Sequence, residues 1–354
     1  MKDKNSAILS DPIQSAQEAH LSYVDDSKPS ITRRYKGKKF LYFGSDGKQI
    51  RDTEVIARIN HLVIPPAWKE VWICPNANGH LQATGRDVRG RKQYRYHTRW
   101  RKTRDETKYE HIIAFGRALP KIRRRVVRDL KQSGLSREKV LATVVRLLET
   151  TLIRVGNDEY ARDNRSYGLT TMHNRHVDIH GSKVTFSFRG KSGKKHVIDV
   201  ENPRLAKIVR RCRDLPGYEL FEYINSDGQP VNVTSFDINQ YLREITKGDF
   251  TAKDFRTWAG TVLAARALQE FKKFSTNTEA KRNMVSAIEA VAKMLGNTPA
   301  ICRRCYIHPT ILDTYLDGSL IRRLKKKAKT KLTNGLHSLR PEEVAVLMLL
   351  QQTF

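Results

Sequence analysis

The chain has 354 residues, of which 39% are hydrophobic, and its formal net charge is +29. The length predicts two domains with enough apolar residues to build cores. Since there is no apolar N-terminal segment and no run long enough to cross a bilayer, we expect a soluble, intracellular protein. The charge far exceeds what solubility requires and indicates a polyanion partner, bound by an enzyme or by a protein that only coats nucleic acid.

The first hundred residues predict a β-rich domain. Residues 1–20 are polar, and we expect a disordered tail. From residue 21 to 98, short aromatic and β-branched runs such as Phe40–Phe43 and Val71–Ile73 alternate with Gly, Pro, Asn and Asp, a pattern typical of strands and turns. The charged segment 99–108 is expected to be a linker.

The next segment predicts two helices followed by a small sheet. Apolar residues recur at three- and four-residue steps from Ile112 to Leu130, and Ser136 can cap a second helix. Between residues 175 and 200 the period returns to two, with Val184, Phe186 and Phe188 on one face. Arg123–Arg125, on the first helix, is expected to be a general electrostatic surface.

Helical patterns dominate again from Phe236 to Leu324. Gly296 can end one helix, and Thr298 and Pro299 can begin the next, which places Tyr306 near its end. Residues 325–354 are expected to be a basic tail with a short helix from Pro341. The predicted fold class is therefore α+β: a small β-rich domain at 21–98, and a larger, mostly α-helical domain at 109–324 with a small inserted sheet.

The cysteines do not predict a metal site or a disulfide framework. Cys74 and Cys212 stand alone, and Cys302 and Cys305 form one CxxC pair without the second ligand pair that structural zinc needs.

Four separate segments of the second domain carry the residues that metal-free cleavage of a phosphodiester would need. That chemistry requires a nucleophile, cations for the charge that develops on the phosphate, and an acid for the leaving oxygen. The segments are TLIRVGNDEY from Thr151, FRGKSGKKH from Phe188, KDFRTWAG from Lys253 and LGNTPAICRRCYIHP from Leu295.

In this order, the segments resemble the poxvirus and bacterial branch of the type IB DNA topoisomerases. The N-terminal stretch from Ile64 to His97 resembles the β-rich DNA-clamping domain of that branch. The resemblance covers roughly residues 20–324. It implies an enzyme that nicks one strand of duplex DNA through a 3′-phosphotyrosyl intermediate and reseals it, relaxing supercoils.

The resemblance also implies a role for each candidate catalytic residue. Arg154 and Arg256 resemble the two arginines that bind the non-bridging oxygens, and Lys191 resembles the general acid. Tyr306 resembles the nucleophile. Asn297 stands where the poxvirus pattern has His; its amide can donate a hydrogen bond to the phosphate but carries no charge.

The candidate DNA-binding residues come from the first domain and from one position in the second. Gln93, Tyr94 and Tyr96 resemble positions that contact DNA in the major groove or at the backbone. A strand with alternating exposed residues is the competing interpretation. Tyr160 resembles a phosphate-contacting residue, although a core position is equally compatible. Arg86, Arg89 and Arg91 are expected to line the clamp.

Each assignment has a structural alternative when it is taken alone. Arg154 and Lys191 can be solvated surface residues, Arg256 can pair with a carboxylate such as Asp254, and Tyr306 can be a packing residue. Their joint occurrence favours catalysis. A non-catalytic DNA-binding protein would account for the charge but not for the ordered motifs.

A tyrosine site-specific recombinase is the second alternative, because that family shares the Arg, Lys, Arg, Tyr set. Recombinases usually have His three residues before the second arginine, where this chain has Lys253, and their N-terminal domain is normally helical. Both features favour the topoisomerase interpretation.

The resemblance further implies the shape, partners and cofactors. We expect a C-shaped, monomeric clamp around duplex DNA, preferably supercoiled, in the cytoplasm and associated with the nucleoid. Neither ATP nor a metal would be required, and Mg²⁺ would at most modulate the reaction.

Overall fold

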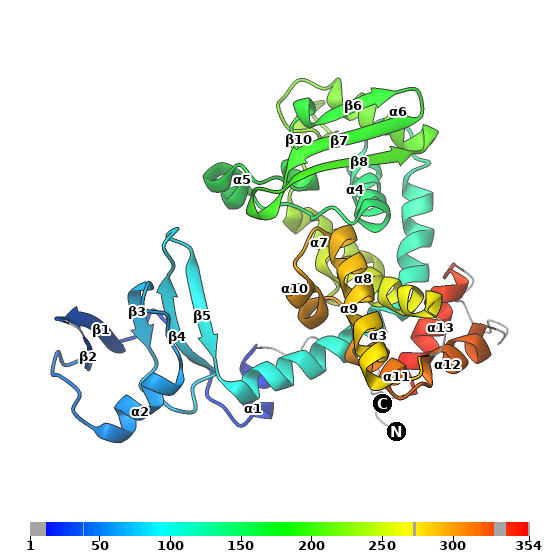
Figure 1. The fold of residues 1–354 in the computed structure, drawn as a ribbon. Helices are drawn as coiled ribbons and strands as arrows, with labels where there is room; N and C mark the ends of the chain where they lie inside the picture. The colour runs from blue at the N-terminus through cyan, green and yellow to red at the C-terminus, as the bar shows by residue number, and fades with distance from the viewer. Residues whose placement is uncertain (1–11, 38, 272–273, 329–337, 353–354) are drawn as a thin grey trace, which may run out of the picture. The chain divides into compact units, whose positions relative to one another are not determined.

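The protein folds as two compact units that meet in sequence between Glu110 and His111. The computed structural model describes residues 12–37, 39–271, 274–328 and 338–352 (Figure 1). The N-terminal unit is built around an antiparallel sheet, and the C-terminal unit is mostly helical with a small sheet of its own. The predicted mixture of helix and sheet is therefore confirmed. Within the described residues no helix is both long and apolar enough to span a membrane.

The N-terminal unit contains a five-stranded antiparallel sheet in the order β2-β1-β3-β4-β5. One face packs on the helix α2 around Ile31, Ile59 and Ile73. Asp52 caps α2 by accepting hydrogen bonds from the first-turn amides of Glu54 and Val55. The elements are β1 (Ile31–Lys36), β2 (Lys39–Phe43), α2 (Thr53–His61), β3 (Lys69–Ile73), β4 (Leu81–Arg86) and β5 (Lys92–Tyr96).

The segment expected to be a disordered tail contains a helix, α1 (Pro12–Glu18). Its Ala16 and the following Ala19 and Leu21 pack with the indole of Trp100 in a small buried cluster. The prediction was wrong for these residues because only tertiary contact with a distant tryptophan covers so short an apolar face. Residues 1–11 lie outside the described part of the chain.

The expected linker at 99–108 is helical. It forms the first part of α3 (Thr98–Asp129), a 32-residue helix. The segment is rich in Arg and Lys, which are good helix formers, but it lacks an apolar repeat, so periodicity alone missed it. From Ile112 onward the predicted apolar face is buried.

The C-terminal unit surrounds its core with helices whose ends match several sequence signals. Ser136 caps α4, Gly296 ends α9 in the left-handed conformation with φ of 62°, and Thr298 caps α10 with Pro299 in its first turn. The elements are α4 (Arg137–Thr151), α5 (Asp158–Asn164), α6 (Pro203–Arg213), α7 (Ser235–Thr246), α8 (Ala252–Glu270), α9 (Asn277–Leu295), α10 (Pro299–Cys305), α11 (Pro309–Leu316), α12 (Leu320–Ala328) and α13 (Pro341–Leu350).

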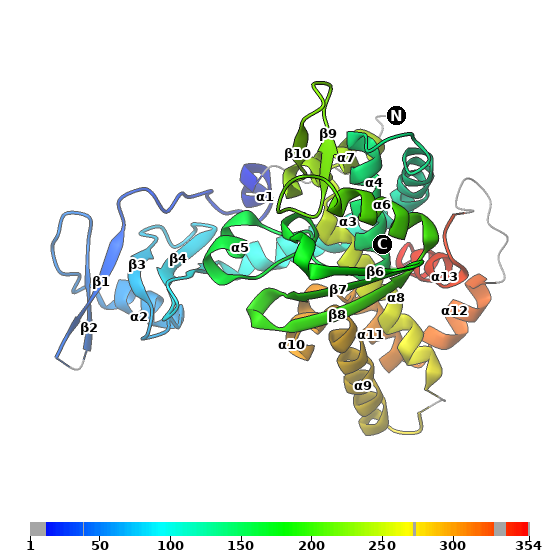
Figure 2. The ribbon, with the colours of Figure 1, turned by 90° about the horizontal axis from the view of Figure 1, so that it is seen from above.

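The sheet inserted in this unit has three antiparallel strands, which lie side by side in Figures 1 and 2. Val184, Phe186 and Phe188 of the middle strand are buried, as the alternation predicts. The strands are β6 (Val177–His180), β7 (Lys183–Arg189) and β8 (Lys195–Glu201); short 3₁₀ turns η1 (Leu169–Thr171), η2 (Asn174–His176) and η3 (Lys191–Gly193) flank them, and a small hairpin, β9 (Glu222–Ile224) and β10 (Pro230–Asn232), follows α6.

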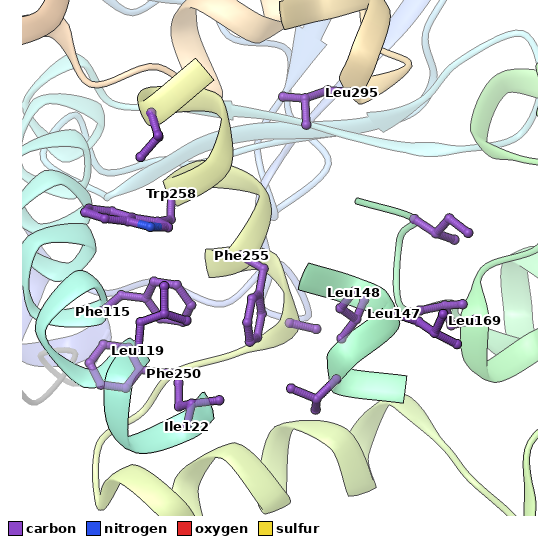
Figure 3. Close-up of a cluster of buried hydrophobic side chains, with 14 of the residues drawn as sticks. Phe115, Leu119, Ile122, Leu147, Leu148, Leu169, Phe250, Phe255, Trp258 and Leu295 are labelled. Atoms are coloured by element: carbon purple, nitrogen blue, oxygen red, sulfur yellow. The ribbon is translucent and has the colours of Figure 1, made fainter. Parts of the chain in front are cut away.

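The main core is where α3, α4 and α8 come together (Figure 3). Phe115 of α3 makes edge-on contacts with Phe250 and Phe255, with ring centroids 5.6 and 5.1 Å apart. Phe255 and Trp258 anchor α8 in this core. The helix that contains Arg256 is therefore fixed on both sides of that residue.

Arg123 is not part of an electrostatic surface, contrary to expectation. It is 9% exposed and forms ion pairs with Glu149 of α4 at 2.6 Å and Glu343 of α13 at 2.7 Å. Glu343 also accepts a hydrogen bond from the Trp258 indole. The end of the chain is thus part of the core, and one buried guanidinium connects three helices.

Candidate active site

Tyr306 is the residue that ends α10. Its backbone amide donates to the Cys302 carbonyl at 2.9 Å, and its own carbonyl accepts from the Thr261 hydroxyl at 3.3 Å. A Cβ on Gly260 would lie 2.6 Å from that carbonyl oxygen. The glycine therefore allows α8 to approach the backbone of Tyr306 closely. Arg256 lies one turn earlier on the same helix, so this approach also brings Arg256 near Tyr306.

Arg256 is buried, with 5% exposure, and is anchored by backbone carbonyls. It donates to the Leu152 carbonyl after α4 and, at 2.6 Å, to the Leu295 carbonyl at the end of α9. Carbonyls at helix C-termini carry partial negative charge and favour a cation. The alternative partner, Asp254, instead accepts hydrogen bonds from the backbone amide and hydroxyl of Thr251 and lies 3.3 Å from His111.

Arg154 lies in the loop that follows α4. The Leu169 amide donates to its carbonyl at 2.9 Å. A Cβ on Gly168 would lie 2.6 Å from the same oxygen, so the glycine permits this close backbone approach. The guanidinium donates to the side-chain oxygen of Asn297, and the buried amide nitrogen of Asn297 has no hydrogen-bond partner among the described residues. Asn297 thus holds Arg154 while a donor remains available.

Lys191 is at the turn between β7 and β8. The turn is closed by hydrogen bonds from the Gly190 amide to Lys194 and from the Gly193 amide to Gly190, at 2.7 and 3.0 Å. Ser192 and Gly193 have positive φ angles of 64° and 75°. The Lys191 side chain is exposed, as a group that reaches toward an incoming ligand must be.

These four residues come together in one pocket. Arg154, Lys191, Arg256 and Tyr306 all line it, although they are separated by up to 152 positions in sequence. Tyr160, on α5, lines the same pocket and is 46% exposed, so it is not a core residue. No carboxylate is among the described residues that line it, and Lys253 adds a further ammonium group.

The Tyr306 side chain lies beside Arg256 and lines the same pocket as Arg154. The pKa of Arg154 is lowered to about 10, first by burial and then by the Arg256 cation, while the charge and hydrogen bonding of Tyr306 act in the opposite direction. Burial likewise lowers the pKa of Arg256, again opposed by Tyr306. The Arg256 guanidinium carbon is 5.2 Å from the centroid of the phenol ring.

A buried arginine, Arg256, and a half-buried one, Arg154, therefore line a pocket with one phenol and have no acidic partner among the described residues. Neither arginine forms an ion pair with a carboxylate of the described chain. Each keeps a desolvation cost that an entering anion would offset. The arrangement can stabilise negative charge that develops on a phosphate placed beside Tyr306.

Comparisons with known proteins agree with this geometry. The family described as "Eukaryotic DNA topoisomerase I, catalytic core" matches residues 97–334, and "Bacterial DNA topoisomerase IB, N-terminal domain" matches residues 39–87. The DNA topoisomerase 1B of Acanthamoeba polyphaga mimivirus is 32% identical over 292 residues, which cover 80% of this chain and 87% of that protein. The DNA topoisomerase 1B of vaccinia virus (strain Copenhagen) is 25% identical over 264 residues, covering 74% and 80%.

The chain belongs to the type IB DNA topoisomerase family. The match to the bacterial N-terminal domain falls in the unit that carries the other candidate DNA-binding residues. Tyr94 and Tyr96 are exposed on β5, with their rings stacked 5.9 Å apart, and Gln93 donates to Asp87. Alternating exposure is thus present on this strand, and two aromatic rings lie on its outer face.

The arginines of the β4–β5 turn differ from those of the pocket. Arg86 pairs with Glu70 at 2.8 Å, and Arg91 pairs with Asp87 at 2.6 Å. Arg89 is exposed and forms no ion pair with the described residues. A DNA phosphate that binds Arg86 or Arg91 would compete with the carboxylate to which each arginine is already paired.

Several pocket residues had no catalytic signal in the sequence. Asn157, Ser166, Tyr167 and Lys253 line the pocket beside the predicted set. Asn157 also caps α5 through its side chain. The one signal in the sequence was Gly156. Its φ is 120°, a conformation that glycine adopts readily and that does not occur in a regular helix or strand.

Proposed function

We propose that this protein relaxes duplex DNA by attacking one strand with Tyr306. The phenol loses its proton to solvent as its oxygen forms a bond to the phosphorus, the bond from phosphorus to the 5′ oxygen breaks, and the protein becomes attached to the 3′ end. The observation that carries the proposal is that Arg154, Arg256 and Lys191 line one pocket with Tyr306, where the Arg256 guanidinium lies beside the phenol ring.

Each polar group of the pocket has a role that follows from its chemistry. Arg154 and Arg256 would bind the non-bridging oxygens, on which charge develops. The free amide hydrogen of Asn297 would add one neutral donor. Lys191 would give a proton from its ammonium group to the leaving 5′ oxygen, and a general acid typically contributes roughly 100- to 10,000-fold to the rate.

Resealing reverses the same steps. The 5′ hydroxyl returns its proton to Lys191 and attacks the phosphotyrosine, and Tyr306 leaves. A phosphotyrosyl ester conserves the phosphodiester bond, so we propose that the reaction needs no ATP. The donors named above are supplied by the protein, and we propose that no metal is required, with Mg²⁺ acting at most as a modulator.

The proposed substrate is duplex DNA, preferably supercoiled, held by a monomer. The two units would act as a C-shaped clamp, with Tyr94, Tyr96, Gln93 and the arginines of the β4–β5 turn on the DNA side and Tyr160 near a phosphate. Rotation of the free duplex end would release torsion. In the cell we place the protein in the cytoplasm, at the nucleoid.

The decisive experiment is relaxation of a supercoiled plasmid in EDTA without ATP. The wild-type protein should relax the plasmid and become attached to the 3′ end of the nicked strand. Tyr306→Phe should bind the plasmid but neither relax it nor form the adduct. Full relaxation by Tyr306→Phe, a 5′ attachment, or a strict need for Mg²⁺ would each refute part of the proposal.

A further inference from the structure

His196 has no role in the reaction proposed above, yet it lines a small cavity together with three of the proposed catalytic residues. It lies on β8 directly opposite Phe188 of β7, and the two rings stack with centroids 5.2 Å apart and planes 21° apart. It is half-buried and borders a small cavity whose walls include Arg154, Lys191 and Arg256.

Two glycines make room for this ring. A Cβ on Gly190 would lie 2.7 Å from the Cδ2 atom of His196, and a Cβ on Gly296 would lie 2.7 Å from its Cε1 atom. Real Cβ atoms are not found so close to another heavy atom, so the imidazole fills the space beside both glycines. It is therefore packed between two backbone segments that are 106 positions apart in sequence.

Each of those glycines directly precedes a proposed catalytic residue. Gly190 precedes Lys191, at the start of the turn, and Gly296 precedes Asn297, which holds Arg154. The Lys191 turn is an exposed hairpin end: residues 190–194 form hydrogen bonds with one another, and the Arg189 carbonyl just before them accepts from the Tyr167 amide. Packing against the His196 ring thus helps to hold the turn in position relative to the rest of the pocket.

The chemistry of the ring fits a packing role. Burial lowers the pKa of His196, and the cations Arg154, Arg256 and Lys194 lower it further. The imidazole is therefore neutral near pH 7 and adds no charge to a site that already holds several cations. Among the hydrogen bonds found for the described residues, none involves its side chain.

We propose that His196 is a positioning residue that fixes the Lys191 turn against the backbone before Asn297, so that the ammonium group meets the leaving 5′ oxygen. The inference rests on the proposed function, because it assigns His196 to the proton-transfer step. It predicts a defect limited to that step rather than a general loss of catalysis.

A sulfur substitution of the leaving oxygen isolates this step. In a duplex with a 5′-bridging phosphorothiolate at the cleavage position, the leaving thiolate is a much weaker base than an alkoxide and needs no general acid. Lys191→Ala should lower single-turnover cleavage of the natural duplex by about 100- to 10,000-fold and cleave the sulfur duplex at close to the wild-type rate.

His196→Ala should behave as a milder form of Lys191→Ala. Because small misplacements of a catalytic group can cost up to about 100-fold, we expect a loss of about 10- to 100-fold on the natural duplex. On the sulfur duplex the loss should be about threefold or less. Wild-type cleavage of the natural duplex by His196→Ala, or equal losses on both duplexes, would overturn the proposal.

The reference variants separate this inference from the function on which it rests. If Lys191→Ala is rescued by sulfur and His196→Ala is not, His196 is not a positioning residue and the general acid stands. If Lys191→Ala is not rescued, the proton-transfer role of Lys191 itself is wrong. His180→Ala is the matched control, because it removes an exposed histidine from strand β6 of the same sheet and should leave both rates unchanged.

Gly190→Ala tests the same contact without removing the ring. Gly190 has φ of −94° and ψ of −166°, which alanine adopts without strain, so its only obstacle is the imidazole. Gly190→Ala should show the same loss on the natural duplex and the same rescue by sulfur. The double variant with His196→Ala should lose no more than the worse single variant, whereas losses that multiply would show that the two residues act independently and contradict the proposal.

Discussion

The arginines of the β4–β5 turn and those of the catalytic pocket bind different kinds of partner. In the turn, Arg86 pairs with Glu70 and Arg91 with Asp87, and the two arginine side chains are 50% and 45% exposed. In the pocket, Arg154 and Arg256 are held by an amide oxygen and by backbone carbonyls. Arg86 and Arg91 are already neutralised, whereas the pocket arginines are fixed in place without a carboxylate partner among the described residues.

This difference explains how one strongly basic chain can contain both general and specific phosphate contacts. An exposed ion pair contributes little to stability, and its cation is readily exchanged between a carboxylate and a phosphate. A buried cation that is oriented by neutral acceptors keeps its full charge for the reacting group. The comparison predicts that changes in the pocket act on rate and that changes in the turn act on affinity and its salt dependence.

Among the changes that test this comparison, the largest effect is expected for Arg256→Ala. Removing one preorganised donor typically costs on the order of 100- to 1,000-fold in rate, and we expect that loss in single-turnover cleavage. Arg256→Lys should recover little, because an ammonium group cannot reach the carbonyls of Leu152 and Leu295 and a phosphate with the same planar geometry. Thermal unfolding checks that both variants fold. Cleavage by Arg256→Ala within about threefold of wild type would show that this arginine is only a structural anchor.

Asn297→Asp should make Arg154 resemble the carboxylate-paired arginines of the β4–β5 turn. The substitution keeps the shape of the side chain but gives Arg154 a carboxylate partner and removes the free amide donor. We expect cleavage to fall by roughly 100-fold, the lower end of the cost of losing a transition-state donor. Asn297→Ala, which removes the donor without adding charge, should lose less. An Asp variant as active as the Ala variant would mean that neutral support of Arg154 does not matter.

Glu70→Gln should free Arg86 of the β4–β5 turn from its carboxylate partner, and we expect the smallest of the three effects. Arg86 loses its charged partner, so the slope of log affinity against log salt should steepen by about 0.9 if the released cation contacts one phosphate. Fluorescence anisotropy with a short duplex at several salt concentrations measures the slope. Asp214→Asn, which releases Arg213 in the C-terminal unit with the same change in net charge, is the control. Equal slopes for both variants would indicate a general charge effect.

Much of the local structure was predictable because it depends on neighbours in sequence. Ser136 caps α4, Gly296 ends α9, and Val184 and Phe186 face the core of the small sheet. The charged start of α3 was missed because helix propensity without an apolar repeat leaves no periodic signal. Helix α1 was missed because its stabilising partner is Trp100, far along the chain.

The candidate site was predicted in its residues but not in its connections. Separate motifs indicated Arg154, Lys191, Arg256 and Tyr306, and all four line one pocket. Nothing in the sequence indicated that Asn297 would hold Arg154 or that His196 would pack against Gly190 and Gly296. Arg123 was placed on the surface because three consecutive arginines give no hint of two acidic partners on other helices.

The sequence by itself determined the basic charge, the helix and strand signals, and the set of chemically competent residues. These depend on composition and on spacings of a few residues, which local sterics and hydrogen bonding convert into structure. Only the tertiary structure decided which cations are neutralised and which remain available, because that depends on contacts across 100 or more positions. Burial then turned the unpaired cations into a site that favours an anion, since a desolvated charge interacts more strongly than one in water.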